Sequence, residues 1–270
     1  MLYCYQINDF LKGKKKMIAN FHTHTYRCNH ASGTDREYVE SAIRAGVKVL
    51  GFSDHSPYWF PNGYYSTHRM KPSEIEDYVN SVLALKEEYK NDIKIHLGFE
   101  AEYYPLYFDK MLEMIAPYPY EYLILGQHFL ENERSHIHVV KPGLGYDALS
   151  RYVDECIAGL ATGKFFYFAH PDVLNFGGSP EAYRSEILRL CRAAKKMNVP
   201  LEINLLGIRE KRAYPRMDFW RLAAEVGNDV IFGSDSHTPD ATALSEDIKA
   251  GMEIVNALKL NLIEPMEPKL

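Results

Sequence analysis

Short apolar runs alternate along the chain with longer segments in which apolar residues recur at helical spacing. The short runs are rich in β-branched and aromatic residues, which favours strands. We expect these strands at residues 17–22, 47–52, 93–99, 122–126, 165–169, 200–204 and 230–233. Helical periodicity lies at about 34–46, 72–89, 146–162, 179–197, 215–226 and 239–258. The first helix is expected to begin at a capping box, Thr34 to Glu37, and to end at Gly46.

This repeated alternation predicts an α/β fold built on a parallel sheet, because parallel strands need crossover connections that helices usually supply. Polar residues that could bind metal follow almost every predicted strand. In a closed barrel the carboxyl ends of all strands share one face, whereas a doubly wound open sheet gathers ligands only at its switch point. We therefore expect a seven-stranded, TIM-like (β/α)7 barrel, one domain over residues 17–270, with a metal site at the C-terminal ends of the strands.

The chemical signal begins with a His-x-His pair. His22 and His24 lie two residues apart at the end of the first predicted strand, so both imidazoles point to the same side. Two histidines this close are often just polar residues on the surface, but later predicted strands also end in histidine, glutamate or aspartate. His30 lies in a loop, and its position leaves its membership of the set open. The candidate metal ligands are His22, His24, His30, His55, Glu100, His128, His170, Asp235 and His237.

Seven imidazoles and two carboxylates exceed what one tetrahedral zinc ion requires. We expect two or three divalent ions with Glu100 or Asp235 bridging, and mixed nitrogen and oxygen donors suit Zn, Mn or Fe. Closely spaced ions stabilise the attacking and leaving oxygens of phosphoryl transfer, so hydrolysis is the expected chemistry. Asp54 is expected to accept a hydrogen bond that orients an imidazole. The remaining histidines are interpreted as solvated or core residues: His68, His96, His136 and His138.

Two arginines lie in loops that follow predicted strands. Arg27 lies between the first histidines and Arg209 follows the sixth strand, and either could grip a phosphate dianion through paired hydrogen bonds. Loop placement is the only support for this role, since a lone arginine is normally a surface residue. The long segment 56–71, rich in Pro, Gly and Tyr, is expected to form a lid or a pocket wall.

Composition limits the alternatives. The 270 residues are 46% hydrophobic and carry a net charge of −5, with no Lys/Arg cluster beyond residues 12–16, which argues against a nucleic-acid partner. No run approaches 18 apolar residues, so no membrane span is expected. The four cysteines form no C-x-x-C pair, which favours idle thiols in a reducing, cytoplasmic compartment. Residues 1–16 place an apolar stretch before lysines, the reverse of a signal peptide, and are expected to be a poorly ordered extension, with Met17 an alternative start.

Seven motifs occur along the chain in an order that resembles one known family. They are His-Thr-His, Ser-Asp-His-Ser-Pro, Gly-Phe-Glu-Ala-Glu-Tyr, Leu-Gly-Gln-His-Phe, Ala-His-Pro-Asp, Glu-Ile-Asn-Leu-Leu-Gly-Ile-Arg and Gly-Ser-Asp-Ser-His. Over about residues 17–265 they resemble the polymerase-and-histidinol-phosphatase superfamily, and within it the histidinol-phosphatases of the kind found in Firmicutes. The resemblance implies a distorted seven-stranded barrel, a trinuclear metal site and hydrolysis of L-histidinol phosphate in histidine biosynthesis.

The resemblance also implies how the ligands divide among three ions. The first ion would take His22, His24, Glu100 and Asp235, the second Glu100, His128 and His170, and the third His30, His55 and His237. The family pattern thus includes His30, which its loop position had left open. All nine positions are filled, so the resemblance implies an intact site.

We expect direct hydrolysis, because no cysteine lies among the motifs to form a phosphoenzyme. A hydroxide would attack phosphorus in line while metal ions and an arginine, Arg27 or Arg209, neutralise the equatorial oxygens. Asp235 or a nearby histidine, His237, would carry the protons. Three carboxylates at strand ends could hold the ammonium or imidazole of the substrate: Glu102, Asp172 and Glu202.

Three other functions stay open. They are an exonuclease-like nuclease of the same superfamily, a phosphoesterase that acts on another small monoester, and a non-catalytic metal-binding protein. The negative net charge disfavours the first, and nine intact ligands disfavour the last. The oligomeric state is left open by the sequence.

Overall fold

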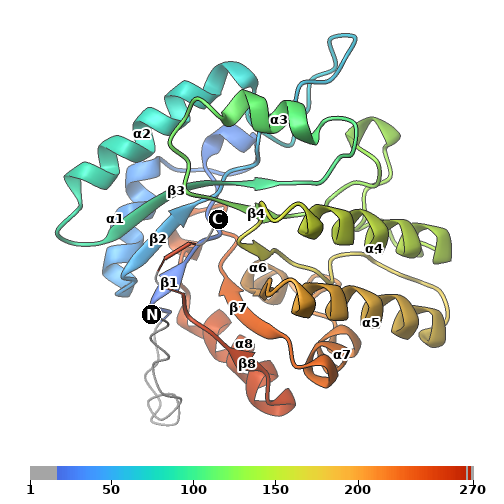
Figure 1. Ribbon diagram of the computed structural model, residues 1–270. Coiled ribbons are helices and arrows are strands. Elements are labelled where there is room, and N and C mark those ends of the chain that lie inside the picture. The colour runs from blue at the N-terminus through green and yellow to red at the C-terminus, as the bar shows by residue number, and fades with distance from the viewer. Residues whose placement is uncertain (1–16, 266, 269–270) are drawn as a thin grey trace.

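The computed structural model describes residues 17–265, 267 and 268, so the expected extension over residues 1–16 lies outside the described residues. The centre of the fold is a parallel sheet whose strands follow one another in chain order, with helices around the outside (Figure 1). The strands are β1 (Ala19–Asn20), β2 (Val49–Phe52), β3 (Lys94–Ala101), β4 (Tyr122–Leu125), β5 (Tyr167–Phe168), β6 (Leu201–Asn204), β7 (Asp229–Gly233) and β8 (Asn261–Leu262). The predicted α/β class with a parallel sheet is confirmed.

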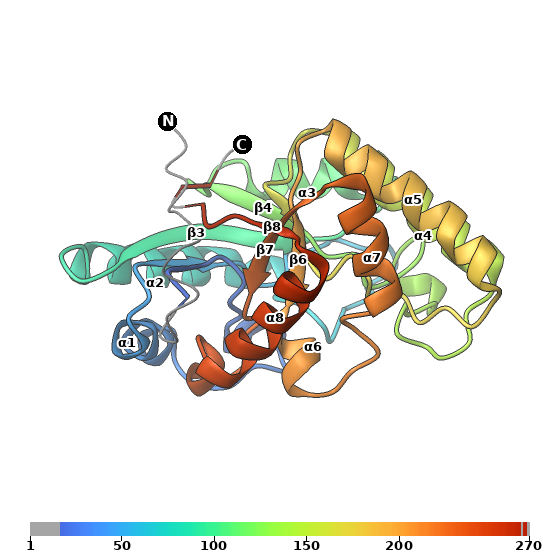
Figure 2. The same cartoon turned by 90° about the horizontal axis from the view of Figure 1, so that it is seen from below.

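Helices connect the strands and cover the sheet, and α4 and α5 pack side by side (Figures 1 and 2). They are α1 (Asp35–Ala45), α2 (Ile75–Glu88), α3 (Phe108–Ile115), α4 (Tyr146–Ala161), α5 (Pro180–Lys196), α6 (Leu205–Arg209), α7 (Met217–Val226) and α8 (Ser245–Leu258). The first begins and ends as predicted, since Thr34 and Glu37 form a capping box and Gly46 ends the helix with φ 84°. No helix in the described part of the chain is long and apolar enough to cross a membrane.

The sheet contains eight strands rather than the predicted seven. The eighth, β8, pairs with Asp229 and Val230 at the beginning of β7. It is two residues long, the first exposed and the second half-buried. It therefore lacks the apolar run by which the other strands could be recognised.

Two helices were also absent from the prediction. α3 buries Phe108, Met111 and Ile115 on one side, so a helical pattern exists there, but only over eight residues. α6 follows β6 without a loop, and the side chain of Asn204, the last residue of the strand, caps it by accepting from the N–H of Gly207. An apolar strand that runs directly into an apolar helix shows no boundary in the hydrophobic pattern.

The sheet curls until the segments that follow β1 and β7 meet. Thr23 and Ser236 form a parallel bridge, and the N–H of His24 donates to the carbonyl of Ser236 over 3.0 Å. The N–H of Ser236 in turn donates to the carbonyl of His22 over 3.3 Å. Residues that follow strands distant in sheet order are thereby brought to one place, as in a TIM-like barrel.

Strand side chains pack in two layers because alternate residues point to opposite faces. Tyr122 belongs to a small buried cluster inside the curl of the sheet, whereas its neighbour Leu123 belongs to the large core shared with the helices. The hydroxyl of Tyr122 donates over 2.9 Å to the carbonyls of both Phe21 and Phe52. These carbonyls lie where β1 and β2 end, so the inner cluster fixes the points from which the first histidines project.

Candidate metal centre

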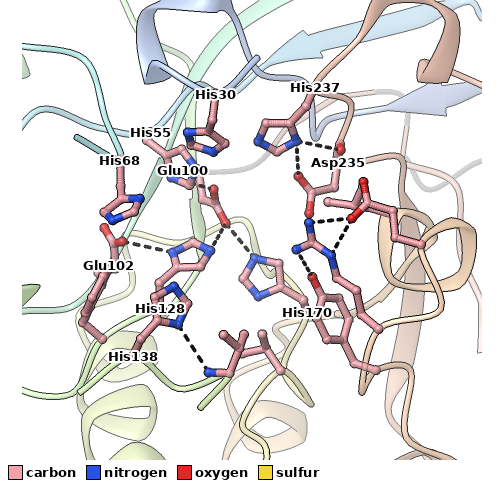
Figure 3. A pocket seen from close by; sticks show the side chains of 17 residues that line it. His30, His55, His68, Glu100, Glu102, His128, His138, His170, Asp235 and His237 are labelled. Carbon is pink, nitrogen blue, oxygen red and sulfur yellow. Dashed lines mark hydrogen bonds and ion pairs between the residues drawn. The ribbon is translucent and has the colours of Figure 1, made fainter. Parts of the chain in front are cut away.

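All nine predicted metal ligands lie together beyond or at the carboxyl ends of the strands, and Figure 3 shows those that line the cavity. His24 and His237 stack with ring centroids 4.1 Å apart, and His30 lies 4.7 Å from His237. The rings of His128 and His170 are 4.8 Å apart. The loop position of His30 therefore does not separate it from the strand-end histidines.

Glu100, near the end of β3, is the centre of the cluster. Its buried carboxylate lies 2.8 Å from Nε2 of His170 and 3.0 Å from Nδ1 of His55. Three more imidazoles place Nε2 between 3.5 and 3.6 Å from the same carboxylate: His22, His24 and His128. A carboxylate that faces five imidazoles is in a position to bridge metal ions.

Asp235, two residues beyond β7, supplies the second carboxylate. Its Oδ1 lies 3.1 Å from Nε2 of His24, 3.6 Å from Nε2 of His22 and 3.4 Å from Nδ1 of His237. Asp235 and His170 have φ values of 47° and 32°, in the left-handed region, which costs a non-glycine residue about 1–3 kcal/mol. Such strain persists where surrounding contacts hold it, and it is common at ligand-binding positions.

Most of the imidazoles have a protein acceptor within hydrogen-bond distance of Nδ1. Nδ1 of three rings lies at hydrogen-bond distance from a carboxylate: His22 from Glu202 (2.8 Å), His128 from Glu102 (3.0 Å) and His24 from Asp54 (3.4 Å). Asp54 thus lies within hydrogen-bond distance of an imidazole, as the expected orienting role requires. Backbone carbonyls of Cys28 and Asp235 hold Nδ1 of His30 and His237 over 2.8 and 3.1 Å. An acceptor at Nδ1 leaves the lone pair of Nε2 free for a metal ion.

Two glycines make room for buried carboxylates of this network. A Cβ at Gly126 would collide with Glu100, lying 2.5 Å from its Cδ and 2.7 Å from its Cγ. A Cβ at Gly233 would collide in the same way with the carboxylate of Glu202. Neither glycine has a positive φ, so the missing side chain, rather than backbone freedom, is what these positions require.

The carboxylates favour protonated imidazoles in part of the cluster. Burial lowers the pKa of His24, but the carboxylates of Asp235 and Asp54, 3.1 and 3.4 Å from its ring nitrogens, outweigh it and raise the pKa to about 9. Burial also lowers the pKa of His22, yet nearby carboxylates, Glu202 foremost, raise it well above its usual range. A divalent ion bound at these nitrogens has to displace their protons.

The donor set fits metal ions. Several buried atoms of the cluster have no hydrogen-bond partner among the described residues: Nε2 of His22, His24 and His237, Nδ1 of His55 and Oε2 of Glu100. Leaving one such buried group unpaired costs about 1–3 kcal/mol, and a bound cation would satisfy it. The sets whose ligand atoms lie within 4.8 Å of one another include His22–His24–Asp235, His22–Glu100–His170 and His24–His55–His237.

A cavity of about 380 Å³ opens onto the cluster (Figure 3). Its wall includes His68 and His138, which the sequence had suggested to be solvated or core residues. His68 belongs to segment 56–71, so this loop contributes one side chain to the cavity wall, whereas the tyrosines on which the expectation of a lid or pocket wall rested are not in the lining. The ring of Phe129 lies 4.6 Å from that of His138 and 5.7 Å from that of His68. We call these three residues the aromatic end of the cavity.

The structure does not bring Arg27 or Arg209 to the cavity wall. Arg27 is 3% exposed, and its guanidinium is bound by Asp35 over 2.9 Å and by Asp77 over 2.7 Å. Nη1 of Arg209 lies 2.9 Å from Asp247. Both arginines are therefore occupied by carboxylates of neighbouring helices.

The arginine in the cavity wall is Arg212. Its Nη1 donates to the hydroxyl of Tyr214 over 3.0 Å, and its Nε donates to Glu210 over 2.8 Å. Arg212 lies three residues after Arg209, and loop position alone did not distinguish the two.

Of the three carboxylates considered for substrate binding, Glu102 alone lines the cavity. Both of its oxygens already accept hydrogen bonds from protein groups. Glu202 is fully buried behind the histidines. Asp172 accepts from the indole N–H of Trp220 over 2.9 Å, away from the cavity wall.

Comparison with known proteins shows which family and which relatives the chain is similar to. A family model described as the PHP domain matches residues 20–205. A probable histidinol-phosphatase of Deinococcus radiodurans is 30% identical over 230 residues, which cover 82% of this chain and 87% of that protein. The histidinol-phosphatase of Bacillus subtilis is 26% identical over 248 residues, covering 80% of this chain and 92% of its own length.

Solved structures share the fold. The crystal structure of a histidinol phosphate phosphatase from Lactococcus lactis, complexed with zinc, L-histidinol and phosphate, aligns with a TM-score of 0.71 at 20% identity, over 94% of this chain and 99% of that one. A second structure, of a putative histidinol phosphatase from Listeria monocytogenes, aligns with a TM-score of 0.68 at 23% identity. The alignment covers 83% of this chain and 96% of that one. The curled parallel sheet with outer helices is thus a known arrangement of the TIM-like-barrel kind.

Proposed function

The chain belongs to the PHP domain family, and from this premise we propose that it is a metal-dependent histidinol-phosphatase, which hydrolyses L-histidinol phosphate to L-histidinol and phosphate. The observation that carries this proposal is the cluster of nine ligands, seven of which line one cavity and several of which have buried atoms without a hydrogen-bond partner among the described residues. A volume of about 380 Å³ lies within the range of sites for small molecules. The enzyme class is a phosphoric monoester hydrolase, and the substrate links it to histidine biosynthesis.

The donor set supports two or three divalent ions, Zn, Mn or Fe, because nine nitrogen and oxygen donors exceed one coordination sphere. The proposed division is His22, His24, Glu100 and Asp235 for one ion, Glu100, His128 and His170 for a second, and His30, His55 and His237 for a third. The spatial set His22–His24–Asp235 supports the first group. When bound, such ions acidify water and neutralise the oxygens of a phosphoryl group.

Arg212 is placed to bind the phosphate of the substrate, because its guanidinium lies in the cavity wall beside the ligand cluster. Glu210 and Tyr214 hold the guanidinium in place. Nε and Nη2 face Glu210 and Nη1 donates to Tyr214, so the remaining N–H groups of Nη1 and Nη2 are the ones that could donate to oxygens of a phosphate dianion. We assign to Arg212 the role that the sequence had suggested for Arg27 or Arg209.

Asp235 and His237 are placed to move protons. Both line the cavity, and Oδ1 of Asp235 lies 3.4 Å from Nδ1 of His237. The attacking water gives up one proton and the departing histidinol alkoxide needs one, so a carboxylate–imidazole pair in contact with the cavity can accept the first and pass it to the second.

The aromatic end of the cavity is the proposed place for the imidazole of the substrate. His68, Phe129 and His138 offer ring faces and edges against which a planar heteroaromatic ring packs well. Burial, together with the charges of His128 and His68, lowers the pKa of His138 to about 4. His138 is therefore neutral near pH 7.

We also propose that the partner is a small molecule rather than a nucleic acid and that the enzyme works in the cytoplasm. The net charge of −5 supports the first point, because nucleic-acid enzymes carry a basic surface. Cys28, Cys156 and Cys191 are buried and free, which supports a reducing compartment.

The proposal is tested by measuring phosphate release from L-histidinol phosphate by the Mn- or Zn-loaded protein. The same protein is assayed on p-nitrophenyl phosphate and single-stranded DNA, with and without a chelator. We expect a strong, chelator-sensitive preference for histidinol phosphate. Equal or faster hydrolysis of the other substrates would leave the metal chemistry but remove the assigned substrate, and bound metal without turnover would refute catalysis.

A further inference from the structure

Arg69, near the end of segment 56–71, is a buried charged residue to which the proposed reaction gives no role. Its side chain is 2% exposed. Nη1 and Nη2 donate to the two oxygens of Glu102 over 3.0 and 2.7 Å, and Nη1 also donates to the carbonyl of Ser56 over 2.8 Å. Nε donates to Glu133. A guanidinium that forks onto one carboxylate fixes the plane of that carboxylate.

The carboxylate that Arg69 holds also orients a predicted metal ligand. Oε1 of Glu102 accepts from Nδ1 of His128 over 3.0 Å, and Nε2 of the same ring lies 3.6 Å from Glu100. Glu102 is 1% exposed, so these protein donors rather than bulk water hold its carboxylate. The direction in which His128 presents Nε2 therefore depends on Glu102, and the plane of Glu102 depends on Arg69.

The same arginine fastens segment 56–71 to the site. Its neighbour His68 lines the cavity. The carbonyl of Arg69 accepts from the side chain of Asn29 over 3.0 Å, next to His30. At the beginning of the segment, the hydroxyl of Tyr58 donates to the carbonyl of Glu102 over 2.5 Å. Both ends of the loop are thus bound to residues adjacent to candidate ligands.

We propose that Arg69 is a positioning residue, which holds Glu102 so that His128 presents Nε2 to the metal centre and which holds segment 56–71 over the cavity. This inference rests on the metal centre of the proposed function. Lysine at this position would keep the positive charge, but a single ammonium cannot replace the fork onto Glu102 together with the bonds to Ser56 and Glu133. The structure therefore assigns the role to the geometry of the guanidinium and not to its charge alone.

The test compares Arg69→Lys and Arg69→Gln with Arg184→Gln. Arg184 is a matched control, because it also binds both oxygens of one carboxylate, Glu225 over 2.9 Å, but on the exposed surface. Metal affinities are measured by chelator competition, with His128→Asn identifying the ions that depend on this ligand. Those ions should bind about 10–100-fold more weakly in both Arg69 variants, while the other ions and Arg184→Gln stay unchanged.

Phosphate release separates positioning from folding. In Arg69→Lys, kcat should be low at limiting metal and recover as the metal concentration is raised. Wild-type affinity for every ion in Arg69→Lys overturns the inference, even where Arg69→Gln fails to fold. A lower unfolding temperature with unchanged metal affinity also overturns it. Wild-type protein that binds no metal or releases no phosphate refutes the proposed function instead.

Discussion

Replacing Gly126 with alanine should disable the metal centre through a single contact. Gly126 directly follows β4, and a Cβ there would lie 2.5 Å from Cδ and 2.7 Å from Cγ of Glu100. The φ of Gly126 is not in the left-handed region, so alanine brings no backbone strain of its own. The perturbation therefore falls on Glu100, the carboxylate that faces five imidazoles.

The size of the displacement follows from these distances. Non-bonded carbons approach to about 3.5 Å, so the side chain of Glu100 has to retreat by about 1 Å. Metal–ligand distances are held within about 0.2 Å, so a carboxylate moved this far cannot keep a bridging position. Glu100 is 1% exposed and lines the cavity, so the space into which its carboxylate could move is that of the metal centre itself. We expect the variant to lose about 1–3 kcal/mol of stability through overpacking and about a hundredfold in kcat.

The assay is metal content by mass spectrometry together with phosphate release from L-histidinol phosphate. Gly145→Ala is the control, because Gly145 has φ −86° and an added Cβ there meets nothing within 4 Å. Adding Glu100→Asp to Gly126→Ala shortens the carboxylate side chain by one methylene and should restore part of the metal content. Full metal content and wild-type kcat in Gly126→Ala alone would refute the reasoning, because Glu100 would then not be fixed as a bridge.

A pKa of about 9 at His24 means that a proton competes with a metal ion below that pH, and a second proton competes at His22, so metal affinity should rise by at least about tenfold per pH unit from pH 6 to 8. Chelator competition across this range checks it, and a flat profile would contradict it. Glu202→Gln removes the charged acceptor of Nδ1 of His22 and should weaken metal binding about 10–100-fold in equilibrium dialysis. Arg212→Gln should lower kcat/KM for histidinol phosphate about a hundredfold. Arg209→Gln should change it less than about threefold, and the opposite ranking would place the phosphate beside Arg209.

The strand order and the ligand cluster could be predicted because both rest on local patterns. His22 follows β1 by two residues and His128 follows β4 by three, so each ligand is readable from the end of its own strand. Parallel strands then bring these ends together whatever the loops do. β8 was not predicted, because Lys259 and Asn261 interrupt its apolar residues and only two residues separate it from the end of α8.

The cavity wall could not be predicted in this way, because loops and helix packing place it. Arg27 and Arg212 both lie on loops near strand ends, yet only Arg212 reaches the cavity. Asp35 on α1 and Asp77 on α2 hold Arg27 instead, and that outcome depends on how the two helices pack. His68 reaches the wall only because segment 56–71 folds back over the strand ends. The hydrophobic periodicity of the sequence predicts neither how these helices pack nor which path this loop takes.

The role of a strand-end carboxylate depends on its depth along the strand. In the register of β6 and β7, Glu202 lies opposite Ile231, four residues before Asp235. Ile231 belongs to the apolar cluster inside the curl of the sheet, so Glu202 lies at the level of that cluster, beneath the ligands. From there it reaches Nδ1 of His22, whereas Asp235, beyond the strand, reaches Nε2 of the same ring. A carboxylate at the level of the apolar cluster, such as Glu202, therefore orients an imidazole, whereas a carboxylate beyond the strand, such as Asp235, can bind the ion. The strand register decides which of the two positions a carboxylate takes.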